Sequence, residues 1–213
     1  MKIGVWNVKM KLYKSKKLLN IDNNAKTIKG QKYKVMTAIL YFAPAKISGF
    51  NVCPHADDCA LTCLNPAGRG QMGSVQLGRI NKTRWYFLER HTFMAQLHKE
   101  IKRHINRCKI KGFKPAFRIN GTSDLKVENM GLIQKYPMAQ WYDYTKNPIR
   151  MKKFIDGKMP SNYHLTFSLG STNKIDAKKV LKLGGSVATV FRDKKLPKKF
   201  MGHKVFNADQ SDL

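Results

Sequence analysis

The chain contains few acidic residues. Asp and Glu number 13 in 213 residues, against 41 Lys and Arg, so the formal net charge is +28 and the sequence pI is about 10.1. Charge of one sign at this density repels itself in a compact fold, which favours a polyanionic partner that neutralises it. The composition therefore predicts a nucleic-acid partner. A lysine bias inherited from an AT-rich genome is the alternative explanation.

Long apolar runs are also missing. No stretch approaches the roughly 20 apolar residues that cross a bilayer, and the first residues lack an apolar segment of the signal-peptide type. We therefore expect no membrane partner and a cytoplasmic location. Thiols stay reduced in that compartment, where clustered cysteines more often bind metal than form disulfides.

Several chemical motifs are absent. The sequence has no Walker motif, no HExxH motif and no internal repeat, and its 6 histidines are scattered without paired ligand spacing. These absences argue against a P-loop nucleotide site and against a zinc protease. They leave the 4 cysteines as the residues most informative about chemistry.

Three cysteines lie close together in the stretch 52–72, VCPHADDCALTCLNPAGRGQM. Cys53, Cys59 and Cys63 have the spacing C-x5-C-x3-C, and Cys108 follows much later. Structural zinc sites usually bring paired ligands at C-x2-4-C spacing, which this loop lacks. A 4Fe–4S cluster held by three thiolates of one loop fits better. Zinc bound by the three cysteines with His55 or Cys108, and cysteines without any ligand, stay open as alternatives.

Strand and helix patterns alternate along the chain from residue 35 onward. The first run, VMTAILYFAPA, is short and apolar and stops at Pro44, as expected for a strand buried on both faces. Later strands and helices follow in units of about 20 to 35 residues, typical of βαβ units. The predicted strands are 35–43, 114–120, 139–144, 163–169, 186–191 and 204–208, and the predicted helices lie within 75–108, 127–134, 148–155 and 176–183.

The predicted fold class is therefore α/β with a parallel sheet. Six such units would form a partial (β/α)6 TIM-like barrel that is open on one side, and an open doubly wound sheet is the alternative. Residues 1–34 are expected to form a basic N-terminal arm or an edge strand. Residues 35–213 are expected to form one barrel-like domain that carries the cysteine-rich loop 52–72.

Polar residues follow the predicted strands. Sites in parallel β/α folds lie at the carboxyl ends of the strands, where the cysteine loop would also lie. Residues of these types also serve as ordinary helix caps and turn residues. The candidate catalytic residues at this rim are Asn120, Ser123, Asp124, Asp143 and Lys146.

Two basic segments are candidates for phosphate contacts. The first is the turn Gly68-Arg69-Gly70, which combines a guanidinium with backbone N–H groups. The second is a helix whose apolar stripe, at four-residue spacing, leaves its cations on the other side. The stripe is Phe93, Leu97, Ile101 and Ile105, and the candidate nucleic-acid-binding residues are Arg69, Lys99, Lys102, Arg103 and Arg107.

A set of motifs in fixed order resembles a known family. The runs TAILYFAPAKISGFNVCP, CALTCLNPAGRG, FRINGTSD, GGSVATVF and LPKKFMGHKVFNADQSD are similar to the bacteriophage "gene product 88" domain family over about residues 25–213. The resemblance implies a phage-encoded protein that acts in the host cytoplasm.

The expected arrangement is also similar at fold level to the radical SAM enzymes. That resemblance implies that Cys53, Cys59 and Cys63 hold the cluster and that SAM meets the rim after the second barrel strand. The usual cysteine spacing in those enzymes is C-x3-C-x2-C, however, and Gly121-Thr122-Ser123-Asp124 replaces their glycine-rich motif. These departures argue against SAM, which stays an open alternative.

Three functional hypotheses follow from the sequence. The first is an iron–sulfur protein, with enzymatic activity left open, that acts on or near nucleic acid. The second is a non-enzymatic nucleic-acid-binding protein whose cysteines are structural. The third is a protein whose basic face binds an acidic host protein.

Overall fold

The protein is described by a computed structural model that covers residues 13–21, 25–61, 63–193 and 195–208. The predicted N-terminal arm therefore lies partly outside the described residues. Within the described part, strand β1 (Leu19–Ile21) pairs antiparallel with β2 (Val35–Leu40), and helix α1 (Ala25–Gly30) connects them.

One six-stranded sheet organises the molecule. Its strands lie in chain order, β1 to β6, and all pairs after the first are parallel. A separate two-stranded hairpin follows near the C-terminus. The remaining strands are β3 (Lys114–Arg118), β4 (Gln140–Thr145), β5 (Tyr163–Ser168), β6 (Val187–Ala188), β7 (Lys199–Phe200) and β8 (His203–Lys204).

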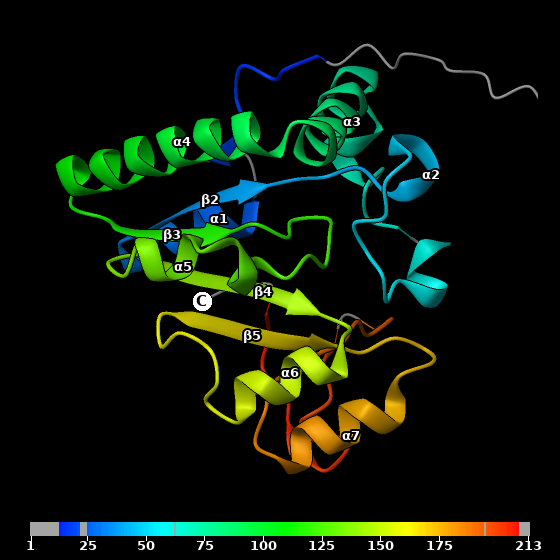
Figure 1. Cartoon of the computed structure of the whole chain (residues 1–213). Coiled ribbons are helices and arrows are strands. Elements are labelled where there is room, and N and C mark those ends of the chain that lie inside the picture. The colour runs from blue at the N-terminus through cyan, green and yellow to red at the C-terminus, as the bar shows by residue number, and fades with distance from the viewer. Residues whose placement is uncertain (1–12, 22–24, 62, 194, 209–213) are drawn as a thin grey trace, which may run out of the picture.

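Helices connect the parallel strands. In Figure 1, α3 and α4 lie at one end of the sheet, and α6 and α7 lie at the other. The remaining α-helices are α2 (Ala45–Ser48), α3 (Gly73–Leu88), α4 (Arg90–Lys111), α5 (Leu132–Lys135), α6 (Pro148–Ile155) and α7 (Lys174–Lys182). Short 3-10 helices are η1 (Gln31–Tyr33), η2 (Asp57–Ala60), η3 (Gly68–Gln71) and η4 (Val127–Met130).

The predicted α/β class with mostly parallel strands is confirmed. The sheet is open, because no pairing among the described strands joins β6 to β1. Its strand order also lacks the reversal that marks a doubly wound sheet.

Two predicted strands are wrong in extent. The segment 186–191 pairs only over Val187–Ala188, opposite the last residues of β5. The segment 204–208 forms no strand of the main sheet, because His203–Lys204 turns back on Lys199–Phe200 through Gly202, which has φ +82°. Short apolar runs predict a strand without predicting its partner.

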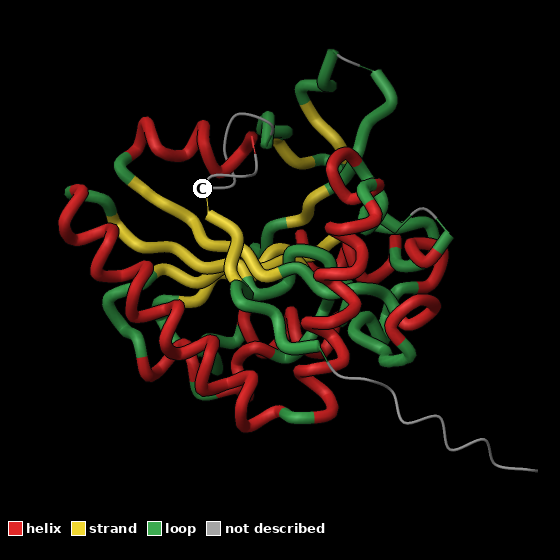
Figure 2. The backbone as a smooth tube through the Cα atoms, turned by 90° about the horizontal axis from the view of Figure 1, so that it is seen from above, coloured by secondary structure: helices red, strands yellow, loops and turns green. Residues whose placement is uncertain are grey.

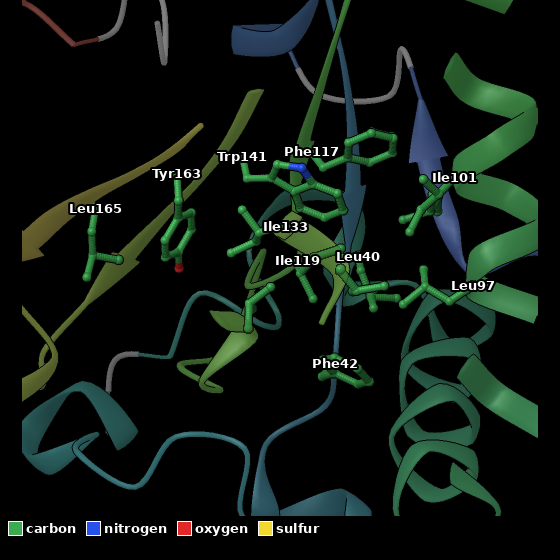
Figure 3. Packing of buried hydrophobic residues seen from close by; sticks show 14 of the residues in the cluster. Leu40, Phe42, Leu97, Ile101, Phe117, Ile119, Ile133, Trp141, Tyr163 and Leu165 are labelled. Carbon is green, nitrogen blue, oxygen red and sulfur yellow. The ribbon is translucent and has the colours of Figure 1, made fainter. Parts of the chain in front are cut away.

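The main core lies between the sheet and the helices (Figure 3). The predicted stripe of α4 is confirmed, since Phe93, Leu97 and Ile101 are fully buried and Ile105 is partly buried against the core. Figure 3 shows Leu97 and Ile101 pointing from α4 toward the sheet. On the sheet side, the rings of Phe117 and Trp141 stack with centroids 4.6 Å apart. This packing fixes the strands in register and thereby positions the loops at their carboxyl ends.

The two faces of the sheet differ in composition. Strand β5 buries Tyr163, Leu165 and Phe167 in the core, whereas the alternate residues His164 and Thr166 are exposed or half-buried. In Figure 2 the strands fan through the middle of the molecule, and most of the helical turns lie on one side of them. We call the side of β2–β5 that points away from the α4 core the second face.

Candidate functional site

Loops from several strands meet at the carboxyl rim of the sheet. The Asp124 N–H donates to Val52 O at 2.8 Å, which ties the loop after β3 to the cysteine loop after β2. The Thr122 hydroxyl donates to Phe42 O at 2.6 Å. The Thr172 hydroxyl, after β5, donates to the Asp57 carboxylate at 2.9 Å. The cysteine loop thus spans the rim from β2 to β5.

Gly121 allows the loop after β3 to pass directly against β2. Its N–H donates to Leu40 O at 2.9 Å. A Cβ at this position would lie 2.7 Å from Ile39 Cγ2, Leu40 O and Tyr41 Cδ1. Only glycine fits there without displacing β2.

The three clustered cysteines are free thiols and each is half-buried. The pKa of Cys53 is raised to about 12, first by burial and then by electrostatic interactions with Asp124, Cys63 and Cys59. All three cysteines lie in the loop between β2 and α3. Among the described side chains, however, no group of three or more His, Cys, Asp or Glu is arranged to hold a metal ion.

Cys108 lies at the opposite end of the sheet. It is buried near the end of α4, immediately before β3 begins at Lys114, and its sulfur is 3.5 Å from His104 Nε2. His104 Nε2 in turn lies 3.0 Å from Met36 O, at the start of β2. Cys108 therefore lies a strand length away from the rim cysteines, which argues against the alternative in which it completes a zinc site with them.

A buried arginine joins the rim to α6. The side chain of Arg150 is 2% exposed. It donates to Asp124 Oδ1 at 2.8 Å and to the Glu128 carboxylate at 3.0 and 2.8 Å. It also donates to the Tyr163 hydroxyl. One guanidinium thus holds residues from the loop after β3, from η4 and from β5.

Asp143 is the innermost carboxyl group of this network. It accepts hydrogen bonds from the Tyr163 hydroxyl at 3.0 Å and from the Asn120 N–H at 2.9 Å. Burial raises the pKa of Asp143 from its ordinary 3.8 to about 6, although the positive charge of Arg150 opposes the rise. Asp143 is only 2% exposed, so its proton is remote from solvent.

The predicted catalytic residues are placed within this network. Ser123 donates to Asn120 Oδ1 at 2.7 Å. The Lys146 backbone N–H donates to Asp124 Oδ2 at 2.9 Å. Asn120, Asp124 and Asp143 form their hydrogen bonds with other residues of the network. This arrangement favours a structural role, in which the residues hold the loops together, over a role in a substrate pocket.

Sequence reasoning did not identify Arg150, Glu128 or Tyr163. Arg150 stands among lysines in a predicted helix, and nothing in its local pattern indicates burial. Its partner Glu128 is 22 positions away, so only the tertiary structure brings the two together.

Helix α4 presents a cationic outer face. Lys99, Lys102 and Arg103 are exposed there, and Arg107 is half-buried. The only acidic residue of α4, Glu100, points inward and accepts hydrogen bonds from the N–H groups of Leu18 and Leu19. The outer face of α4 therefore carries positive charge that no acid of the same helix offsets.

Arg69 is placed apart from these cations. It lies in η3, which packs against the start of α3. Its exposed side chain is at the carboxyl rim rather than on α4. The predicted set of five nucleic-acid-binding residues thus divides into one rim residue and a group on α4.

Comparison with known proteins identifies a family. The family model described as gene product 88 matches residues 11–213, a longer span than the sequence motifs indicate. No curated protein and no solved structure matches. The resemblance to radical SAM enzymes is accordingly unsupported. Within the described residues, no helix is long and apolar enough to cross a membrane.

Proposed function

The chain belongs to the phage gene product 88 family, and we propose that it is a nucleic-acid-binding protein that contacts phosphates through the outer face of α4 in the host cytoplasm. The observation that carries this proposal is the row of exposed cations on α4, together with the inward orientation of Glu100.

The spacing of the α4 cations suits a phosphate backbone. Lys99, Arg103 and Arg107 recur every four residues, so they form a row along one side of the helix, and Lys102 lies beside it. Like charges at this spacing repel one another and destabilise the helix. A bound polyanion removes that repulsion and releases its own counterions, which drives association.

Internal networks use several of the acids that would otherwise offset this charge. Glu100 and Asp143 are buried, and the side chains of Asp124 and Glu128 are 12% and 14% exposed. The exterior is consequently more basic than the composition alone indicates.

Salt dependence tests this proposal. Affinity for a labelled duplex should fall by a factor of about 10 or more between about 50 and 200 mM salt if three or more phosphates are neutralised. Fluorescence anisotropy measures it directly. Absence of binding at the lower salt concentration would contradict the proposal and leave lysine bias as the explanation of the charge.

An acidic host protein is the competing partner for the same face. Recovery of partners from infected cells, with and without nuclease treatment, separates the two. Nuclease should remove the partners if nucleic acid bridges them. An acidic protein that is retained after nuclease treatment would favour the competing partner.

A second candidate function is metal binding by Cys53, Cys59 and Cys63, with a 4Fe–4S cluster as the first choice and zinc as the alternative. The presence of three half-buried thiols in one loop at the rim supports it. Because the described groups do not form a metal site as they stand, binding requires the loop to rearrange.

Anaerobic purification with iron and zinc analysis tests this second candidate. Cys59→Ser should remove the metal, whereas Cys108→Ser, at the other end of the sheet, should retain it. A metal-free, colourless wild-type protein would overturn the candidate.

A further inference from the structure

The second face of the sheet carries several polar and aromatic side chains that are not buried. In parallel sheets that are covered on both sides, the residues on both faces are usually apolar. Here the side chains on β3–β5 that alternate with the core residues include Arg118, Tyr144, His164 and Thr166, and each of these is exposed or half-buried. Ala116 and Tyr142 on the same face are buried, so the accessible part of the second face is polar and aromatic.

Strand pairing places these residues as neighbours. Phe117 lies opposite Trp141, and Tyr144 lies opposite Thr166, so Arg118 and Tyr144 belong to the same face of adjacent strands. The Arg118 guanidinium lies 4.6 Å from the centroid of the Tyr144 ring, the diagonal contact that such a register allows.

A second pair of the same kind lies at the end of β2. Tyr41 follows the core residue Leu40 and so points toward the second face. The Arg79 guanidinium, from α3, lies 4.9 Å from the Tyr41 ring centroid. Burial lowers the pKa of Arg79, while the nearby Tyr41 and Cys63 oppose that effect.

Gly121 lies beside the Tyr41 ring. It lies in the loop after β3, and its missing side chain allows the backbone to lie directly against Ile39 and Tyr41. The carboxyl end of the second face therefore carries two half-buried tyrosine rings, each with a guanidinium beside it. The Arg79 guanidinium also donates to Asn65 Oδ1 at 3.0 Å, which holds it to the cysteine loop.

We propose that this end of the second face binds single-stranded nucleic acid, with bases stacking on the Tyr41–Arg79 and Tyr144–Arg118 pairs. Unpaired bases stack on aromatic rings and on arginine planes, and a cationic surface then follows the backbone. Bases within a duplex cannot reach such a surface. The inference rests on the proposed function and adds a second contact surface, on the side of the sheet opposite α4, that takes unpaired bases only.

The test uses the full-length protein with a fluorescein-labelled single strand of about 12 nucleotides and the duplex of the same sequence. Tyr144→Leu should weaken single-strand binding about 5- to 100-fold, because a stacked base is lost. The matched variant Tyr144→Phe keeps the ring and should bind as wild type does. Duplex affinity should change less than about twofold in both variants, since duplex binding uses phosphates.

The outcomes separate this inference from the proposed function. Unchanged single-strand affinity in Tyr144→Leu, with binding still dependent on α4, overturns the stacking inference alone. Failure of the wild-type protein to bind either probe overturns the proposed function. A poly-glutamate peptide serves as the competing probe. If Tyr144→Leu weakens its binding by the same factor as it weakens single-strand binding, the inference is also overturned, and an acidic peptide is favoured instead.

Cross-linking keeps the inference testable if Tyr144→Leu does not fold. A 5-bromouracil-substituted single strand is irradiated with wild-type protein, and the modified peptides are identified by mass spectrometry. Adducts on Tyr41 or Tyr144 support the inference. Adducts confined to α4 overturn it.

Discussion

Arg150 of α6 and Glu128 of η4 are joined by paired hydrogen bonds of 3.0 and 2.8 Å, although they lie 22 positions apart in the chain. Arg150 also holds Asp124 of the preceding loop. That loop carries Gly121 and contacts the cysteine loop through Val52 O. One buried guanidinium therefore links α6 to the loop after β3 and, through that loop, to the cysteine loop.

Replacing Arg150 by Met should lower the free energy of unfolding by about 3–5 kcal/mol, because it leaves buried carboxylates without a partner. Urea denaturation measures the change. Lys152→Met on the same helix is the control, because Lys152 pairs with Asp156 at the surface, where ion pairs contribute little. Equal effects of the two substitutions would show that the Arg150 network does not hold the rim.

Asp143 should make stability depend on pH. Its pKa is raised to about 6 in the folded protein, so the folded state binds the proton more tightly than the unfolded state. The resulting stabilisation is fully present below about pH 4 and is lost as pH rises through about 6, with a magnitude of about 3 kcal/mol.

The isosteric variant Asp143→Asn isolates this effect from the other titrating groups. The wild-type free energy of unfolding minus that of Asp143→Asn should decrease from pH 4 to pH 7. A difference that stays constant over this range would mean that Asp143 titrates normally.

Gly121→Ala should destabilise the protein by about 1–3 kcal/mol, because its Cβ overpacks the backbone and side chains of β2. Gly78→Ala is the matched control. Gly78 lies within α3 with open space around its Cβ position, so alanine should stabilise the helix by about 0.5–1 kcal/mol. Thermal unfolding of the two variants should therefore shift in opposite directions, and a shift in the same direction would contradict this explanation.

The sequence predicted the parts of the fold that depend on local periodicity. The stripe through Phe93, Leu97 and Ile101 identified the buried side of α4, and the polar residues after each strand identified the rim. The length of β6 was not predictable from its own sequence, because it depends on how many residues of β5 pair with it, and only Phe167 and Ser168 do so.

The details of the site were less accessible from the sequence. Asp143 was recognised as a rim residue, but its partners Tyr163 and Arg150 come from elements that only the fold brings together. The pairing of Arg118 with Tyr144 likewise depends on strand register, which short strands do not encode locally. The cysteine spacing predicted a metal loop, and that remains a prediction.

The most direct test of the central proposal compares two triple variants that remove the same charge. Lys99, Lys102 and Arg103 of α4 are replaced by alanine in one, and the exposed Lys178, Lys179 and Lys182 of α7 are replaced in the other. Duplex binding is measured against salt concentration. We predict that the magnitude of the slope of log affinity against log salt concentration decreases by about 2 to 3 in the α4 variant, while the α7 variant keeps the wild-type slope. Equal losses in both variants would contradict a phosphate-binding face on α4.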